Sequence, residues 1–320
     1  MDRQVAKQAG IAGAGAFAEL ARKEGGLTRT VLEAVLPGIC GRETSANPEG
    51  WSSDNPLWGH CAVVSVLAQD VLGGKLLRAS LEKDSRFGFM GSHYENRLGD
   101  GSELDFTRGQ FGENYPENLK FEERSRDYVL YDPKTGSPRP IMERYKTLAW
   151  RFMTSVSEGN LLFEDNIYRK CFGSAMESSC QKMRFGVVIL HGQEVVYEGS
   201  NVTLAPLKHM CEPKCMRLGI ESRTEAMLGA CAHAEELGIW SVAKRGIRLE
   251  ECKLYVAGFH TNHTPYIKEA AEHTCLRCST QMYNAGVGRI YVPVKDHWEG
   301  ITAEEAVRTS AAYALGNKQV

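Results

Sequence analysis

Apolar residues in the C-terminal half of the chain are spaced in two ways, one typical of strands and one typical of a helix. Four short runs rich in β-branched and aromatic residues predict strands: residues 183–190 (MRFGVVIL), 194–198 (EVVYE), 253–258 (KLYVAG) and 288–294 (GRIYVPV). Residues 226–244 are rich in alanine and contain no proline, so they predict one helix. With a second helix opening at Cys275, the predicted order is strand, strand, helix, strand, helix, strand.

The N-terminal half has a different pattern. The apolar run 62–72 predicts a helix with Cys61 at its start, and residues 144–153 (RYKTLAWRFM) predict an amphipathic helix. Between these helices, His93 and Asp105 are placed on two successive strands joined across an Asp-Gly turn. This half is therefore expected to be an α+β domain.

A small, polar stretch at 155–160 (SVSEGN) is the best candidate for a domain boundary. A chain of 320 residues is long enough for two domains with a core in each. We expect a helical or disordered extension at 1–26, an α+β domain at 27–157 and a second domain at 158–320. The whole chain is predicted to be a two-domain α/β protein.

The net charge and the cysteine content of the chain limit the classes of function that we expect for it. The formal net charge is −2, so the chain has no overall basic field for a nucleic-acid backbone, although a local basic patch is not excluded. Ten cysteines fit a reducing cytoplasm in which thiols bind metal or react. No apolar run of about 18 residues predicts a membrane span, and the N-terminus does not read as a secretory signal. We expect a cytoplasmic protein that forms a homo-oligomer.

Four residues in the C-terminal half form a metal-site pattern. His233, Cys275 and Cys278 can ligate one zinc ion and leave the fourth tetrahedral position to water, as in a catalytic rather than a structural zinc site. Glu235 is not needed as a ligand and can move a proton from the zinc-bound water to a leaving amine. Cys275 at a helix N-terminus is expected to be acidified by the helix dipole. This spacing is the one used by zinc nucleobase deaminases.

Six short runs carry a family resemblance: Phe185-Gly186-Val187-Val188, Glu198-Gly199-Ser200-Asn201, His233-Ala234-Glu235, Leu254-Tyr255-Val256, Cys275-x-x-Cys278 and Asn284-Ala285-Gly286-Val287-Gly288-Arg289-Ile290-Tyr291. With them, residues 183–294 resemble the cytidine deaminase superfamily, in particular its deoxycytidylate and tRNA adenosine deaminase branch. The resemblance implies an α/β/α sandwich with a mixed five-stranded sheet and hydrolytic deamination by Glu-assisted attack of zinc-bound hydroxide. It also implies that Asn201 and Ala234 contact the substrate.

Two departures leave the substrate open. Thr274 stands where the family usually has proline before the first zinc cysteine, and residues 260–273 form an extra run where relatives have nucleotide-contacting loops. A further loop with Cys211 and Cys215 is similar to the cysteine-bearing loop of deoxycytidylate deaminases. Together with His209, these cysteines could hold a second, structural zinc, for which His260, His263 and His273 are also available from the extra run. The alternative is that they are ordinary free thiols and surface histidines.

The N-terminal half carries a second constellation. Cys61 at a helix start, His93 on a strand and Asp105 on the next follow the logic of papain-like thiol enzymes. In that logic the helix end acidifies the thiol, the histidine deprotonates it and the carboxylate orients the histidine. The alternative is that Cys61 is a buried helix cysteine and that His93 and Asp105 hold a hairpin together.

Several runs between residues 27 and 153 carry a second resemblance: Gly59-His60-Cys61-Ala62-Val63, Ser92-His93-Tyr94-Glu95-Asn96-Arg97-Leu98, Asp105-Phe106-Thr107-Arg108, Gln110-Phe111 and Arg144-Tyr145. This segment resembles the small bacterial YunG-like family. Glu95 stands where that family usually has tryptophan. The resemblance does not define an activity, because function does not follow from such an analogy.

Two function hypotheses follow. In the first, the chain is a zinc deaminase of a small nucleoside or nucleotide, most readily of the cytosine type, fused to a Cys-His-Asp thiol-enzyme domain. In the second, it is an effector that edits nucleic acid, and the N-terminal domain binds or processes a protein partner. The near-neutral charge favours the first.

Overall fold

The computed structural model describes residues 15–211, 214–220, 229–267 and 275–314. The chain divides into two compact units, Met1–Gly159 and Asn160–Val320. Of the expected N-terminal extension, the described part contains the short helix α2 (Ala18–Lys23), and residues 1–14 lie outside the described residues. Among the described helices, none has the length and apolar character needed to cross a membrane.

The N-terminal unit is built on a four-stranded antiparallel sheet in the order β3-β2-β1-β4. Its strands are β1 (Lys75–Ser80), β2 (Ser92–Arg97), β3 (Glu103–Leu104) and β4 (Glu122–Arg124). The predicted strand for His93 is confirmed as β2, in which His93 pairs with Ala79. Asp105, in contrast, follows β3 rather than lying on it, because its carboxylate accepts hydrogen bonds from Thr107 and turns the chain there.

After α2, the α-helices of this unit are α3 (Arg29–Ile39), α4 (Cys61–Leu72), α5 (Arg126–Leu130) and α6 (Ile141–Val156). Of these, α4 packs on β1 and β2, and α3 and α6 pack against α4. The predicted helix that opens at Cys61 is confirmed as α4, whose residues Val63 to Ala68 are all buried. Asn96 on β2 donates to the Ser65 carbonyl at 2.9 Å and so fastens the sheet to α4. The predicted helix 144–153 is confirmed within α6, which begins three residues earlier.

The C-terminal unit contains a mixed sheet in the order β12-β11-β9-β5-β6, with a short sixth strand, β10, paired with β9. The predicted strands are confirmed as β5 (Met183–His191), β6 (Glu194–Ser200), β9 (Cys252–His260) and β11 (Arg289–Val294). Strands β10 (Pro265–Tyr266) and β12 (His297–Ile301) were not among the four predicted. Only the pair β9 and β11 is parallel among the described neighbours, which makes the sheet mixed.

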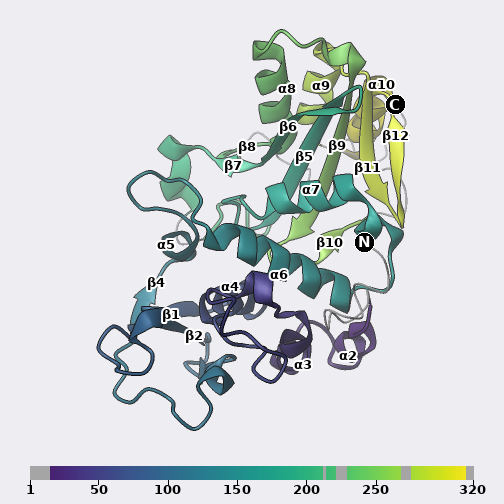
Figure 1. Ribbon diagram of the computed structural model, residues 1–320. Coiled ribbons are helices and arrows are strands. Elements are labelled where there is room, and N and C mark those ends of the chain that lie inside the picture. The colour runs from purple at the N-terminus through teal and green to yellow at the C-terminus, as the bar shows by residue number, and fades with distance from the viewer. Residues whose placement is uncertain (1–14, 212–213, 221–228, 268–274, 315–320) are drawn as a thin grey trace. The chain divides into compact units, whose positions relative to one another are not determined.

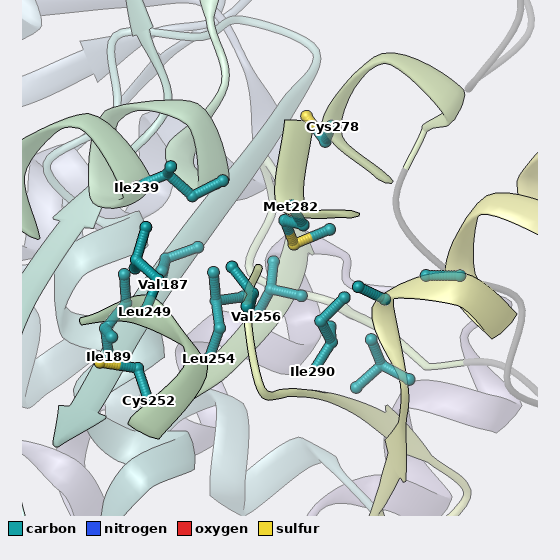
Figure 2. Close-up of a cluster of buried hydrophobic side chains, with 14 of the residues drawn as sticks. Val187, Ile189, Ile239, Leu249, Cys252, Leu254, Val256, Cys278, Met282 and Ile290 are labelled. Atoms are coloured by element: carbon teal, nitrogen blue, oxygen red, sulfur yellow. The ribbon is translucent and has the colours of Figure 1, made fainter. Parts of the chain in front are cut away.

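Helices cover both faces of this sheet (Figure 1). On one face lies α7 (Asn166–Ala175), and on the other lie α8 (Ala234–Lys244), α9 (Leu276–Asn284) and α10 (Ala303–Ala314). The two-residue period of a strand sorts its side chains between these faces. On β5, Val187 and Ile189 join the core under α8 and α9, shown in Figure 2. Gly186 faces α7, where a Cβ would lie 1.8 Å from the Cys171 carbonyl oxygen.

The helix predicted at 226–244 is wrong over part of its length. Residues 229–233 are not helical, and α8 begins at Ala234; residues 221–228 lie outside the described residues. The reason is a local strand pair, because β7 (Val202–Thr203) pairs antiparallel with β8 (Cys231–Ala232). Tertiary pairing thus overrides the helix propensity of these alanine-rich residues. His233 therefore precedes the helix instead of lying near its middle.

Candidate metal centre and thiol site

Two helix N-termini carry the predicted zinc ligands. His233 is the extended residue before α8, Cys275 is the extended residue before α9, and Cys278 lies in the first turn of α9. Because the first backbone N–H groups of a helix have no partner within it, a helix start favours negative charge nearby. Both helices therefore present their positive ends where thiolates are needed. Cys275 and Cys278 are buried, and His233 is half-buried.

The three donor atoms fit one zinc ion. His233 Nδ1 lies 3.1 Å from Cys278 Sγ and 3.4 Å from Cys275 Sγ, and all three atoms lie within 4.8 Å of one another. Tetrahedral zinc with its usual Zn–N and Zn–S bond lengths places nitrogen and sulfur ligands roughly 3.5 Å apart. Within the described parts of the chain, this is the one group of three such side chains gathered so closely. Three protein ligands leave a fourth position open.

Electrostatics prepare this centre for a cation. A hydrogen bond from Cys278, helped by His233, lowers the pKa of Cys275 to about 4 against the penalty of burial, so this thiol is a thiolate at neutral pH. Glu235, in the first turn of α8, is 5 % exposed. Burial raises its pKa to about 7, with His233 opposing the shift. A carboxyl group with this pKa can both accept and release a proton near neutrality.

A buried carboxylate that the sequence analysis missed joins the two ligand-bearing helices. Glu236 is fully buried, and its Oε2 accepts a hydrogen bond from the His233 backbone N–H at 3.0 Å. Its Oε1 lies 2.5 Å from Arg277 Nε and accepts from Gln281 Nε2 at 2.7 Å. One side chain on α8 thus holds both the ligand-bearing loop and the first turns of α9. In the sequence, the one indication of this contact was Arg277, a basic residue between Cys275 and Cys278 that calls for an acidic partner.

The two residues expected to contact substrate are placed differently. Ala234 is fully buried at the start of α8, beside His233. Asn201 is 6 % exposed, and its side chain is bonded to the chain itself. Its Oδ1 accepts from the Phe185 N–H and the Ser178 hydroxyl, each at 2.8 Å, and its Nδ2 donates to the Met183 carbonyl at 3.0 Å. Asn201 therefore anchors the end of β6, with one amide hydrogen left for a ligand.

The second candidate zinc site has an unexpected composition. Cys211 and Cys215 are buried and packed together, whereas His209 is exposed. The structure adds Cys180, whose thiol interacts with that of Cys231 and lies within electrostatic range of Cys215. All four are free cysteines. Of the histidines considered beside them, His273 lies outside the described residues, as does Thr274. A second zinc remains a prediction.

In the N-terminal unit, the three residues predicted to form a thiol site lie together. His93 is fully buried, and its Nε2 lies 2.8 Å from Asp105 Oδ2. Cys61 interacts with the same imidazole. Burial alone would lower the pKa of His93, but Asp105 and Cys61 outweigh burial and raise the pKa to about 9. An imidazole with this raised pKa can accept a proton from a neighbouring thiol.

Gln110 completes this site and was noted in the sequence only as part of the YunG-like resemblance. Its Nε2 lies 3.4 Å from His93 Nδ1, and its Oε1 accepts from the Gly59 N–H at 3.1 Å. Gly59 has φ +74°, and a Cβ there would lie 2.4 Å from Ser45 Oγ, so glycine is required in this turn. The amide of Gln110 and the backbone N–H of Cys61 are donors that could stabilise an oxyanion.

Comparison with known proteins agrees with this geometry. Residues 163–294 match the family model of the cytidine and deoxycytidylate deaminase zinc-binding region, and residues 28–157 match that of the YunG protein. No curated protein and no solved structure matches the chain. The donor set at His233, Cys275 and Cys278 makes zinc the cofactor of this centre. The chain thus joins a region similar to the YunG protein to a region similar to the cytidine and deoxycytidylate deaminase zinc-binding region.

Proposed function

We propose that Asn160–Val320 is a hydrolytic deaminase that removes the amino group of a nucleobase in a nucleoside or nucleotide, with a cytosine base preferred. The observation that carries this proposal is the gathering of His233, Cys275 and Cys278 at two helix starts, with the buried carboxyl of Glu235 two residues from the first ligand. A catalytic zinc needs this combination of three ligands and a separate proton carrier.

The residues divide the chemistry between them. Bound zinc would acidify and polarise a water molecule for attack on the ring carbon that carries the amine. Glu235 would accept the proton of the attacking water and deliver it to the departing amine. Its pKa of about 7 suits both steps. Glu236 would take no part in proton transfer, because its two oxygens already hold His233, Arg277 and Gln281.

Release of ammonia from a panel of substrates tests this function. We expect turnover of cytidine, deoxycytidine or their monophosphates, and none with Glu235→Gln. The matched control, Glu194→Gln at the exposed first residue of β6, should keep wild-type activity. Turnover of single-stranded DNA or tRNA without turnover of free nucleotides would support the nucleic-acid editor instead. No turnover of any of these substrates would overturn the proposal.

The arrangement of Cys61, His93 and Asp105 favours a second function for Met1–Gly159, that of a thiol hydrolase or acyltransferase. Cys61 Sγ would attack an acyl carbon, and its proton would pass to His93 and then to the leaving amine or alcohol. Water or another acceptor would then cleave the thioester and restore the thiol. Asp105 would hold the imidazole in the tautomer that accepts this proton.

Alkylation of individual cysteines in the full chain tests the thiol function. At neutral pH, iodoacetamide should modify Cys61 faster than Cys40 or Cys171, because burial raises the pKa of both of these thiols well above its usual value. His93→Ala should slow labelling of Cys61, whereas the control His297→Ala, at an exposed histidine, should not. If Cys61 labels no faster than the other two thiols and ignores His93→Ala, the unit is better viewed as a binding module.

A further inference from the structure

A cavity of about 540 Å³ lies in the N-terminal unit, with Cys61 in its wall. This volume falls within the range of roughly 300–1,000 Å³ that is usual for small-molecule sites. Ser92, whose carbonyl oxygen lies 3.8 Å from Cys61 Sγ, also lines the cavity. The residue that carries the proposed nucleophile therefore lies in the wall of a pocket of substrate size.

All charged residues that line the cavity are positively charged. Arg139 and Arg144 line it, and its lining contains no aspartate or glutamate. Nη1 of Arg144 donates to the Thr44 carbonyl at 3.3 Å, and among the described residues neither arginine forms an ion pair with a carboxylate. Burial lowers the pKa of Arg144, with Cys61 opposing the shift, so this cation is held partly out of water. The Arg144 guanidinium therefore lacks the bidentate carboxylate partner that such a group usually has in a protein.

Two helix starts add to the positive field. The first residues of α4, Cys61 and Ala62, and the start of α6, Pro140 and Ile141, all line the cavity. Neither helix has a side-chain hydrogen bond at its N-cap. The positive ends of both helix dipoles therefore lie beside the same cavity as the arginines. A cavity with these features and a reactive thiol is suited to an anion.

We propose that this cavity binds a small acyl compound with a free carboxylate, which pairs with Arg144 and Arg139 while its amide or ester carbon lies beside Cys61 Sγ. The proposal rests on the proposed thiol function of Cys61. In the reaction, the C–S bond forms as the C–N or C–O bond breaks, and the thiol proton leaves with the amine or alcohol. Water then splits the thioester into a second carboxylic acid and the free thiol. Phe89 and Val129 offer apolar contacts to the carbon chain.

Two alkylating reagents that differ in charge test the inference in the full-length protein. Iodoacetate carries a carboxylate, and iodoacetamide is its neutral analogue. The rate at which each modifies Cys61 is measured by mass spectrometry of the peptide that contains it. Relative to the same ratio for free cysteine, we expect Cys61 to prefer iodoacetate about tenfold, as expected for a charge-assisted hydrogen bond. Acetate at constant ionic strength should protect Cys61 from both reagents.

Arginine variants locate the source of this preference. Arg144→Gln should abolish the preference for iodoacetate, measured as the ratio of the two labelling rates. Arg139→Gln, at a residue before α6, should reduce the preference and serves as a second variant if Arg144→Gln does not fold. Arg29→Gln on α3, outside the cavity, should change neither rate. Rapid, His93-dependent labelling without any charge preference would overturn the inference and leave the thiol function standing. Slow labelling by both reagents, insensitive to His93→Ala, would instead remove the thiol function itself.

Discussion

At the scale of single residues, burial decides what the carboxylates of this chain can do. Glu235, Glu236 and Glu95 are all buried, yet their surroundings differ. Glu236 has three hydrogen-bonding partners, whereas Glu235 faces the metal ligands and Glu95 faces other acidic side chains. The same side-chain type can therefore carry a proton, fasten two helices or destabilise a strand, depending on what replaces its water.

Replacing Glu235 should separate catalysis from metal binding. Because Glu235 is not a ligand, Glu235→Gln should keep the full zinc content while deamination falls by about 10²–10⁴-fold, the usual value of general acid–base catalysis. Zinc content is measured by mass spectrometry of the metal, and activity by ammonia release. Activity within a few-fold of wild type would show that Glu235 is structural.

Glu95 should make the N-terminal sheet depend on pH. Burial, followed by Glu103 and Asp105, raises the pKa of Glu95 to about 7, with His93 and Arg97 opposing the shift. The pKa of Glu95 is higher in the folded protein than in the unfolded chain, where it is about 4.5. Its contribution to the stability of the folded state is therefore fully present below pH 4.5 and is lost as the pH rises through 7. At pH 8 the ionised Glu95 carboxylate therefore destabilises strand β2.

Glu95→Gln should accordingly stabilise β2 at pH 8 by about 1–3 kcal/mol and give no gain near pH 4.5. Hydrogen exchange of peptides that cover residues 75–97, corrected for intrinsic rates, measures this sheet locally. Glu82→Gln, at an exposed loop position, serves as the control and should have no effect. An equal gain at both pH values would rule out ionisation as the cause.

At the scale of elements, the metal centre depends on how α8 and α9 are held together. Each helix brings its N-terminus to the site, and Glu236 bridges them through Arg277 and Gln281. Cooperative support of this kind orients ligands that are far apart in sequence. It also explains why a carboxylate is tolerated with no exposure to water, because its oxygens are fully paired.

Removing the Glu236 bridge should speed the loss of zinc under conditions in which the C-terminal unit stays folded. Glu236→Gln removes the charge that Arg277 pairs with, and since Arg277 is about one third exposed, we expect a cost of about 1–3 kcal/mol. The half-time of zinc loss to a chelator should shorten at least tenfold, a loss in the range reported for residues that support metal ligands. Glu304→Gln, at an exposed pair on α10, should change neither stability nor zinc release. Unchanged zinc release in Glu236→Gln would contradict the bridging role.

At the scale of the whole molecule, the two candidate sites belong to separate compact units with separate cores. The zinc ligands come from Asn160–Val320, and the thiol site and its cavity come from Met1–Gly159. Each set of residues is complete within its own unit. The chemistry of one site should therefore survive the loss of the other.

A pair of variants tests this independence. Cys275→Ala combined with Cys278→Ala should lose the zinc and destabilise its unit, because metal binding is coupled to folding. Labelling of Cys61 should remain unchanged in that variant. Cys61→Ala should in turn leave zinc content and ammonia release at wild-type values. Wild-type protein should hold one zinc per chain, or two if the cluster around Cys211 and Cys215 binds metal. Full zinc in the double variant would remove the ligand assignment.

The sequence alone was sufficient to predict the three candidate zinc ligands and most of the scaffold that holds them. Residue type was sufficient to predict the strands β5, β6, β9 and β11, because short runs rich in β-branched and aromatic residues favour strands. Spacing and residue type were also sufficient for His233, Cys275 and Cys278, because few uses other than metal binding need these side chains in this order. The helix start at Cys61 was predicted for the same kind of local reason.

Tertiary structure decided what local patterns could not. The start of α8 was shifted to Ala234 by pairing of β8 with β7, a contact between segments some 30 residues apart. The two partners of Glu236 on α9, Arg277 and Gln281, lie 41 and 45 residues away. The cavity beside Cys61 needs Arg144 from a helix 83 residues further on. Such distances carry no periodic signal, since loop closure and packing, not propensity, bring these residues together.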